Sequence, residues 1–157
     1  MTYQLKTIGK VKNDEKGTFI QLEPEYICGL QALEGFSHIN VIWWFSDCDN
    51  AADRNQLQMQ QPYREAPEIM GVFATRAPER PNPIALTTSE IISIDFARGI
   101  VRVAFIDAND DTPILDIKPY TPSLDRVENP KVPAWCSKWP GSTEASGCFD
   151  WSQVFSF

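Results

Sequence analysis

The stretch Ile84-Ala-Leu-Thr-Thr-Ser-Glu-Ile-Ile-Ser-Ile-Asp95, with a second run from Gly99 to Asp107, indicates the fold class of this chain. Aliphatic and β-branched residues dominate both runs, as is typical of strands that are at least half buried. The segment Asp95-Phe-Ala-Arg-Gly99 between them has the composition of a turn. The pattern therefore predicts two strands joined by a short turn.

Other short strands and two short helices are predicted around this pair. The further strands are Tyr3–Val11, Thr18–Leu22, His38–Phe45, Gly71–Thr75 and Ile114–Ile117, with a turn at Lys12–Gly17. The helices are Glu25–Leu33 after Pro24, and Asn50–Met59 with Asn50 as its cap. Many short strands with turns between them indicate a mainly β barrel or sandwich with small helical insertions. The chain has no Gly-x-Gly, so the glycine fingerprint of a dinucleotide-binding fold is absent.

The length and composition are those of one ordinary globular domain. The chain has 157 residues, of which 43% are hydrophobic. From Pro119 to Pro140 prolines recur and periodicity is weak. We therefore expect a single domain over 1–157, with a barrel core over about 1–125 and an irregular, aromatic C-terminal extension over about 126–157.

Charge and cysteine content narrow the class of protein further. A formal net charge of -7 argues against broad binding of nucleic acid, because it repels phosphates. Four cysteines without a Cys-x-x-Cys pair, and one histidine, predict no metal site. The first ten residues lack the apolar run of a signal peptide, and Ile39–Phe45 is too short to span a bilayer. The expected location is the cytoplasm, with reduced thiols and no membrane contact.

A proline-rich loop, Arg76-Ala-Pro-Glu-Arg-Pro-Asn-Pro83, is the first candidate binding site. Its prolines forbid a helix and restrict the backbone, so the loop loses little entropy when a ligand binds. Arginine forks suit carboxylates, and the Asn82 amide suits the edge of a base. The alternative is a rigid connection whose arginines pair with Glu79 and nearby acids.

The acidic segment from Asp107 to Tyr120 is the second candidate site. Its carboxylates could accept ribose hydroxyls, face a sulfonium cation or take a proton from an amine. Asp110 and Asp111 fit a turn in which aspartates cap local amides. Asp107 and Asp116 adjoin apolar strand residues, so we expect them to point inward and to be functional. Ser46 and Asp47 follow the strand at His38–Phe45, at a barrel end where ligand contacts are common.

Several of these motifs together resemble the TsaA/TrmO-like family. They are Phe36-Ser-His38, Gly71-Val-Phe-Ala-Thr-Arg76, Arg80-Pro-Asn-Pro-Ile84 and Thr112-Pro-Ile-Leu-Asp-Ile-Lys-Pro-Tyr120. The resemblance extends over roughly Ile8 to Asp125, in the form of a short stand-alone member. It implies an antiparallel β-barrel of six to seven strands that binds S-adenosylmethionine and forms a homodimer with the site near the interface. It also implies methylation of N6 of threonylcarbamoyl-adenosine, next to the anticodon in tRNA.

The resemblance also implies roles for individual residues. The cofactor contacts carried over by motif position are Ser46, Asp47, Arg76, Leu86, Ala104, Phe105, Ile106 and Asp107. Asp116 and Tyr120 are the catalytic candidates, as acceptors of the proton that N6 loses. Arg80, Asn82 and Lys118 match family motifs without an assigned role.

The chain departs from the family pattern at several positions. The turn Lys12–Gly17 replaces an early Pro-Arg-Gln loop, and Asp111 stands where glycine is usual. Ala77 and Ala85 replace a usual serine and a usual glycine. Two other functions therefore stay open: methyl transfer from S-adenosylmethionine to a small molecule, and a non-catalytic S-adenosylmethionine sensor or interaction protein.

Overall fold

The computed structural model of the chain describes residues 2–157, which form two compact units. One unit runs to Asp49 and resumes from Pro83 to Arg126. The other consists of Asn50–Asn82 and Val127–Phe157. The expected barrel core over about 1–125 included residues 50–82, which lie in the second unit. The association of 50–82 with the C-terminal segment was not expected, and the assignment of all 157 residues to one domain stays a prediction.

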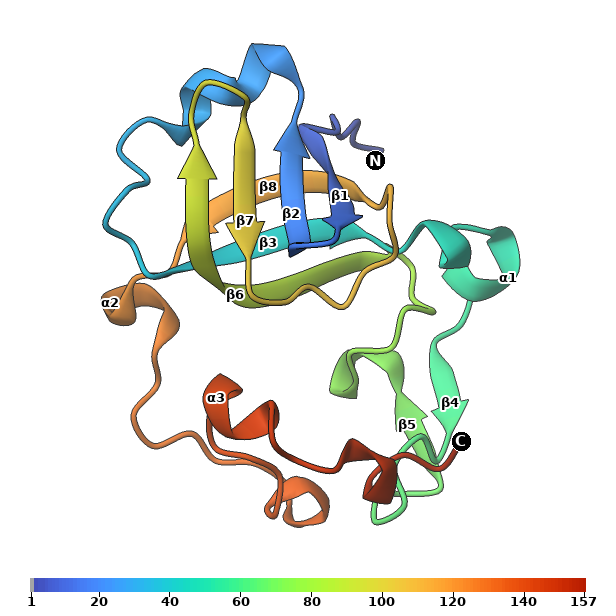
Figure 1. Cartoon of the computed structure of the whole chain (residues 1–157). Coiled ribbons are helices and arrows are strands. Elements are labelled where there is room, and N and C mark those ends of the chain that lie inside the picture. The colour runs from blue at the N-terminus through green and yellow to red at the C-terminus, as the bar shows by residue number, and fades with distance from the viewer. Residues whose placement is uncertain (1) are drawn as a thin grey trace. The chain divides into compact units, whose positions relative to one another are not determined.

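The first unit is a closed antiparallel barrel, and its described strands follow the order β1-β2-β7-β6-β3-β8 (Figure 1). These strands are β1 (Gly9–Asp14), β2 (Gly17–Leu22), β3 (His38–Trp44), β6 (Ile84–Asp95), β7 (Ile100–Val103) and β8 (Pro113–Pro119). Short helical pieces accompany them: η1 (Pro24–Leu30), η2 (Ser46–Cys48) and α2 (Pro122–Asp125). The predicted mainly β class and the antiparallel barrel of six to seven strands are therefore confirmed, with six strands in the barrel of the described residues.

The core of the barrel follows from the alternation of side chains along its strands. In β3, Ile39, Val41 and Trp43 are buried while the residues between them are half-buried. The fully buried aliphatic residues are Val11, Ile20, Ile39, Val41, Val101 and Ile114. The helix η1 adds Leu30 to the same core. Each such side chain contributes about 1.5–3 kcal/mol through removal from water.

Several strand predictions are confirmed and others are wrong for identifiable reasons. The range Ile84–Asp95 is confirmed to the residue. The first strand begins at Gly9 rather than Tyr3, because its partner β2 ends at Leu22, opposite Gly9. The strand predicted for Gly99–Asp107 ends at Val103, where the backbone turns to hydrogen-bond Glu90 and Ser89.

The second unit contains short elements only. They are α1 (Ala51–Arg54), β4 (Gln58–Gln60), β5 (Ile69–Gly71), η3 (Val72–Ala74), η4 (Ala134–Cys136), α3 (Thr143–Ser146) and η5 (Trp151–Gln153). Asn50 caps α1 as predicted, because its Oδ1 accepts hydrogen bonds from two backbone amides. The remainder of that predicted helix is wrong, since it contains β4. The strand predicted for Gly71–Thr75 is mostly wrong, since η3 takes its place.

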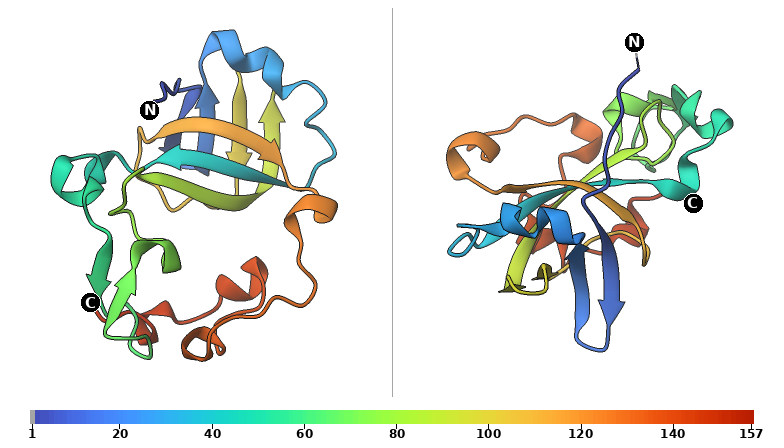
Figure 2. Two further views of the ribbon diagram at one scale, coloured as in Figure 1. Left: turned by 180° about the vertical axis from the view of Figure 1, so that it is seen from behind. Right: turned by 90° about the horizontal axis from the view of Figure 1, so that it is seen from above.

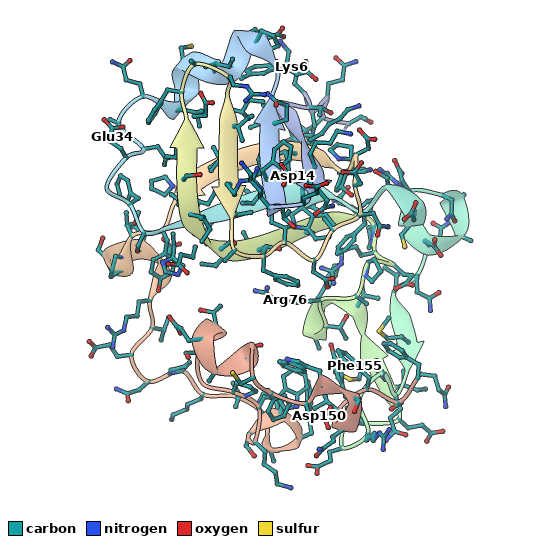
Figure 3. All side chains as sticks on the ribbon, in the orientation of Figure 1. Lys6, Asp14, Glu34, Arg76, Asp150 and Phe155 are labelled. Atoms are coloured by element: carbon teal, nitrogen blue, oxygen red, sulfur yellow. The ribbon has the colours of Figure 1, made fainter. Side chains whose placement is uncertain are left out.

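The C-terminal segment is tied to residues 62–64 inside the second unit. The amide of Arg64 donates to the carbonyl of Val154 at 2.9 Å, and the amide of Ser156 donates to Pro62 at 3.1 Å. The Arg64 guanidinium donates to the carbonyls of Phe155 and Ser152. Phe155 is labelled among the side chains of this segment in Figure 3. The irregular aromatic tail predicted from the sequence is therefore confirmed, and it packs on a segment from the middle of the chain.

Asp111 has a left-handed backbone, with φ of 65°. This explains why glycine is usual here in the family pattern, because only glycine adopts that region without a steric cost. The Asp111 carboxylate lies 3.0 Å from Lys12 Nζ and 3.5 Å from Lys10 Nζ. The hydrogen bond from Lys12 lowers the pKa of Asp111 below its ordinary value.

We expect Asp111→Ala to be less stable than Asp111→Gly by about 1 kcal/mol. Both variants lose the ion pairs, so their difference isolates the cost of a Cβ atom at positive φ. Urea unfolding of the two variants under one set of conditions measures that difference. Equal midpoints would show that the turn relaxes around the alanine.

We expect Ile114→Ala to lower the free energy of unfolding by about 2–5 kcal/mol, because Ile114 is fully buried in the barrel. The matched control is Ile92→Ala in β6, since Ile92 is 56% exposed. The control should change stability by no more than about 0.5 kcal/mol. Similar losses in both variants would contradict the assignment of the core.

Candidate functional site

The outer face of the neighbouring strands β8, β3 and β6 carries several predicted site residues. Seen from behind (Figure 2, left), these three strands lie side by side across the barrel. Strand pairing aligns Asp116, Ile42 and Leu86 in one row. Side chains that pair directly across antiparallel strands project to the same face. The barrel therefore places the predicted catalytic Asp116 and the predicted cofactor contact Leu86 on either side of Ile42.

The next row along this face is polar and consists of Lys118, Asn40 and Thr88. Asn40 accepts a hydrogen bond from Thr88 Oγ1 at 2.6 Å and donates to Asp125 Oδ1 at 3.0 Å. The sequence did not single out Thr88. The alternation of β3 was the available signal for Asn40, because it places Asn40 and Ile42 on one face.

Asp116 is held by two partners on its own strand. Its Oδ2 lies 2.7 Å from Lys118 Nζ, and its Oδ1 accepts from the amide of Ile117 at 2.9 Å. The Asp116 carboxylate raises the pKa of Lys118 above its ordinary value. The expectation that Asp116 points inward is wrong, because its pairing with Ile42 puts it on the outer face. Asp107 is exposed, so the same expectation is wrong there.

Tyr120 lies just beyond β8. Its amide donates to the carbonyl of His38 at 3.0 Å, and its ring meets the His38 ring edge-on with centroids 6.3 Å apart. Four residues of extended chain separate Asp116 from Tyr120, which is about 13 Å. The catalytic roles of both residues stay predictions.

Ser46 and Asp47 lie in η2, directly after β3. The amide of Phe45 donates to the carbonyl of Pro83 at 2.8 Å, which fixes the end of β3 beside the start of β6. Asn109 Nδ2 donates to Asp47 Oδ2 at 3.0 Å. No sequence pattern singles out Asn109, since it lies in a loop among aspartates. The structure shows that it orients a predicted cofactor ligand.

The loop between β7 and β8 runs alongside β6 (Figure 1). The amide of Ala104 donates to the carbonyl of Glu90, and the amide of Phe105 donates to Ser89 Oγ. The Phe105 side chain is 62% exposed, whereas Ile106 belongs to the barrel core. Only the backbone of Ile106 is therefore available to a ligand, while Phe105 offers its ring.

The proline-rich loop of the second unit is braced by Arg80. Its Nε donates to the carbonyl of Ala77 at 2.7 Å, and its Nη2 donates to Thr75 at 2.9 Å and to Val72 at 3.3 Å. One planar guanidinium that donates to three carbonyls holds the loop in place, which agrees with the alternative that the loop is a rigid connection. The acceptors are backbone carbonyls rather than the acidic side chains that this alternative named.

Arg76 and Asn82, at either end of the same loop, have exposed side chains. Arg76 is labelled in Figure 3. A backbone hydrogen bond links Arg76 to the hydroxyl of Tyr63. Burial raises the pKa of Tyr63 above its ordinary value, and this hydrogen bond opposes the rise. These contacts place the loop against Tyr63 within the second unit.

The predicted site residues fall into two groups. Those around β3, β6 and β8 belong to the first unit: Ser46, Asp47, Leu86, Ala104, Phe105, Ile106, Asp107, Asp116, Lys118 and Tyr120. Arg76, Arg80 and Asn82 belong to the second unit. The first group surrounds one sheet face and the adjoining strand ends. It combines exposed apolar side chains with carboxylates that are already oriented by hydrogen bonds.

Residues 2–157 contain no group of three or more His, Cys, Asp or Glu side chains arranged to bind a metal ion. In the same part of the chain, no helix is long and apolar enough to cross a bilayer.

The fold and this face define a small antiparallel barrel whose outer face carries carboxylates oriented by hydrogen bonds. Residues 8–126 match the model of the tRNA-methyltransferase O N-terminal domain. The chain therefore belongs to the TsaA/TrmO-like family, as its motifs indicated.

Individual relatives agree with this membership. An S-adenosyl-L-methionine-binding protein of Archaeoglobus fulgidus is 37% identical over 78% of this chain and 93% of its own length. A tRNA (adenine(37)-N6)-methyltransferase of Mus musculus is 37% identical over 69% of this chain and 24% of its own length. The crystal structure of TrmO from Pseudomonas aeruginosa aligns with a TM-score of 0.62 at 28% identity, over 83% of this chain and 62% of that one.

This chain is shorter than several of the proteins that it resembles. It spans 38% of a longer probable S-adenosyl-L-methionine-binding protein of Archaeoglobus fulgidus, which is 34% identical to it.

We expect Arg80→Lys to lower the free energy of unfolding by about 1–3 kcal/mol, because a lysine cannot reproduce three hydrogen bonds from one planar group. Arg98→Lys is the matched control, since the Arg98 side chain is exposed in the β6–β7 turn. Urea unfolding followed by tryptophan fluorescence measures both. If the two variants unfold at the same urea concentration, the brace contributes nothing.

Proposed function

We propose that this chain is an S-adenosylmethionine-dependent methyltransferase that acts on N6 of threonylcarbamoyl-adenosine next to the anticodon in tRNA. The observation that carries the proposal is the match of residues 8–126 to the tRNA-methyltransferase O N-terminal domain. The similarity to the S-adenosyl-L-methionine-binding protein of Archaeoglobus fulgidus supports the cofactor, and the similarity to the tRNA (adenine(37)-N6)-methyltransferase of Mus musculus supports the acceptor.

The residues of the first unit fit the chemistry of S-adenosylmethionine. Leu86 and Phe105 are 47% and 62% exposed, so they offer apolar surface to an adenine ring. Asp47 uses Oδ2 for Asn109, and its other oxygen is available to a ribose hydroxyl. Arg76 is proposed, by motif position, to hold the carboxylate of the cofactor. When bound, S-adenosylmethionine supplies a methyl group on a sulfonium.

The proposed transfer needs alignment and one proton acceptor. Bound S-adenosylmethionine would supply the methyl carbon to N6 and would keep the electron pair of the broken carbon–sulfur bond on its sulfur. A side chain of the protein would take the proton that N6 loses. Asp116 is the proposed acceptor, because Lys118 and the amide of Ile117 fix its orientation on the exposed face. Tyr120 is the alternative acceptor.

A different acceptor is favoured by one specific observation. The barrel unit has 14 acidic residues against 8 basic ones, whereas the second unit has 7 against 6. An acidic barrel repels the phosphates of RNA, which favours a small molecule as acceptor or a sensor without an acceptor. If the acceptor is RNA, its binding would depend on the less acidic second unit.

We also propose that the protein acts in the cytoplasm as a homodimer with the cofactor near the subunit interface. Ile84, Leu86 and Phe105 are large apolar residues exposed on the barrel unit, and a second copy would bury such residues. Sedimentation velocity tests this arrangement, and a purely monomeric species at micromolar concentration would refute it.

We expect label transfer from methyl-labelled S-adenosylmethionine to tRNA isolated from cells that lack this protein. Nucleoside analysis of the product should place the label on N6 of threonylcarbamoyl-adenosine. Transfer to a small-molecule fraction of the cell, with none to tRNA, would support the second acceptor. Cofactor binding without transfer to any fraction would support the sensor.

We expect Asp47→Ala to weaken S-adenosylmethionine binding about tenfold, or about 1.4 kcal/mol, because a ribose acceptor is lost. Asp110→Ala is the matched control, since Asp110 lies in the same loop as Asn109 but contacts Lys12 and the amide of Asn13. Isothermal titration calorimetry measures both. Arg76→Ala should also weaken binding, and an unchanged affinity would remove Arg76 from the proposed site.

A further inference from the structure

The second unit contains a pocket that none of the proposed cofactor contacts lines. Its volume is about 240 Å³, and the rings of Tyr63, Trp135, Trp139 and Phe149 line much of it. Small-molecule sites commonly occupy roughly 300–1,000 Å³. The pocket is therefore suited to one planar group of a larger ligand rather than to a whole small molecule.

The rings are arranged as a braced stack. Tyr63 and Trp135 are nearly parallel, at 11°, with centroids 5.5 Å apart. Trp139 meets both rings edge-on, with centroids 4.9 Å and 5.4 Å away. No third group fits between Tyr63 and Trp135 at that spacing, so the pair cannot enclose a cation between two faces. A planar ligand would instead extend the stack.

The charged residues at the pocket favour an anionic ligand. Arg64, Lys138 and Glu65 contribute two positive charges and one negative charge. The Arg64 guanidinium is fixed by the carbonyls of Phe155 and Ser152, so its position is set before any ligand binds. Lys138 Nζ lies 3.2 Å from Glu65 Oε1, and the Lys138 side chain is 80% exposed. Lys138 can therefore turn to a phosphate at little cost.

We propose that this pocket binds an unpaired base of the RNA substrate, with a neighbouring phosphate at Lys138. Aromatic side chains that stack on bases, beside cations that pair with the backbone, are the general means of binding single-stranded nucleic acid. The inference rests on the proposed function, in which the acceptor is an RNA. In this proposal the near-neutral second unit binds the RNA, because the acidic barrel repels its phosphates.

The test measures binding of a dye-labelled oligoadenylate by fluorescence anisotropy, on the full chain. Trp135→Leu should weaken binding about tenfold, because one base loses its stacking partner. Trp135→Phe should retain much of the affinity, since it preserves a ring. Trp151→Leu is the matched control, because Trp151 belongs to the same group of contacting rings but does not line the pocket. Thermal unfolding by circular dichroism verifies that each variant is folded.

A second pair of variants tests the charge. Lys138→Ala and Glu65→Ala break the same ion pair, but only the first removes a cation. We expect Lys138→Ala to bind RNA more weakly than wild type, and its affinity to fall less steeply with salt concentration, because one phosphate contact is lost. Glu65→Ala should bind as tightly as wild type or more tightly. Equal effects of the two substitutions would overturn the proposal.

The outcomes separate this proposal from the proposed methyltransferase. If wild type labels tRNA and Trp135→Leu does so with an unchanged KM for tRNA, the pocket proposal is overturned and the enzyme stands. If wild type transfers no methyl group but binds the oligoadenylate through Trp135, the enzyme proposal falls and the pocket proposal stands. Wild type that does not bind the oligoadenylate also overturns the pocket proposal.

Discussion

The pairing of β3 with β6 on one side and with β8 on the other is the interaction on which the candidate site depends. β3 lies between two partners, so its inward residues form the centre of the core and its outward residues form the centre of a sheet face. The register fixes which residues meet on that face. A shift of one residue would exchange the core for the surface, and Ile42 would no longer separate Leu86 from Asp116. Burial of Ile39 and Val41 therefore determines the position of the proposed chemistry.

The strands were predictable wherever a local pattern determines the backbone. Aliphatic and β-branched residues dominate Ile84–Asp95, which is bounded by Pro83 and a turn, and the strand in the structure has the same limits. The residues at which a strand begins or ends inside the sheet were not predictable, because pairing with a strand distant in sequence determines them. β7 stops at Val103 because the following amides bond to β6, and the start of β1 depends on the end of β2.

The candidate site was predictable as a set of motifs but not as an arrangement. Asp116 was expected inward from its apolar neighbours, yet the β3–β8 register pairs Val41 with Ile117 and therefore brings Asp116 opposite Ile42 on the outer face. The sequence of the loop does not distinguish Arg80 from Arg76. In the structure Arg80 donates hydrogen bonds to three backbone carbonyls, and only the folded positions of Val72 and Thr75 show this. Asn109 acts through Asp47, a contact between residues far apart in the chain.

The interleaving of the two units constrains the order in which the chain can fold. The second unit takes one part from the middle of the chain and the other from its end, and residues 83–126 intervene. During synthesis the middle segment emerges long before Trp135 and Phe155, so its ring partners are absent while β6, β7 and β8 assemble. The barrel can therefore close while the second unit is still incomplete. A ribosome that stalls or terminates before the last residues would release a barrel whose inserted segment has an uncovered aromatic surface, which is the kind of surface that chaperones and proteases detect.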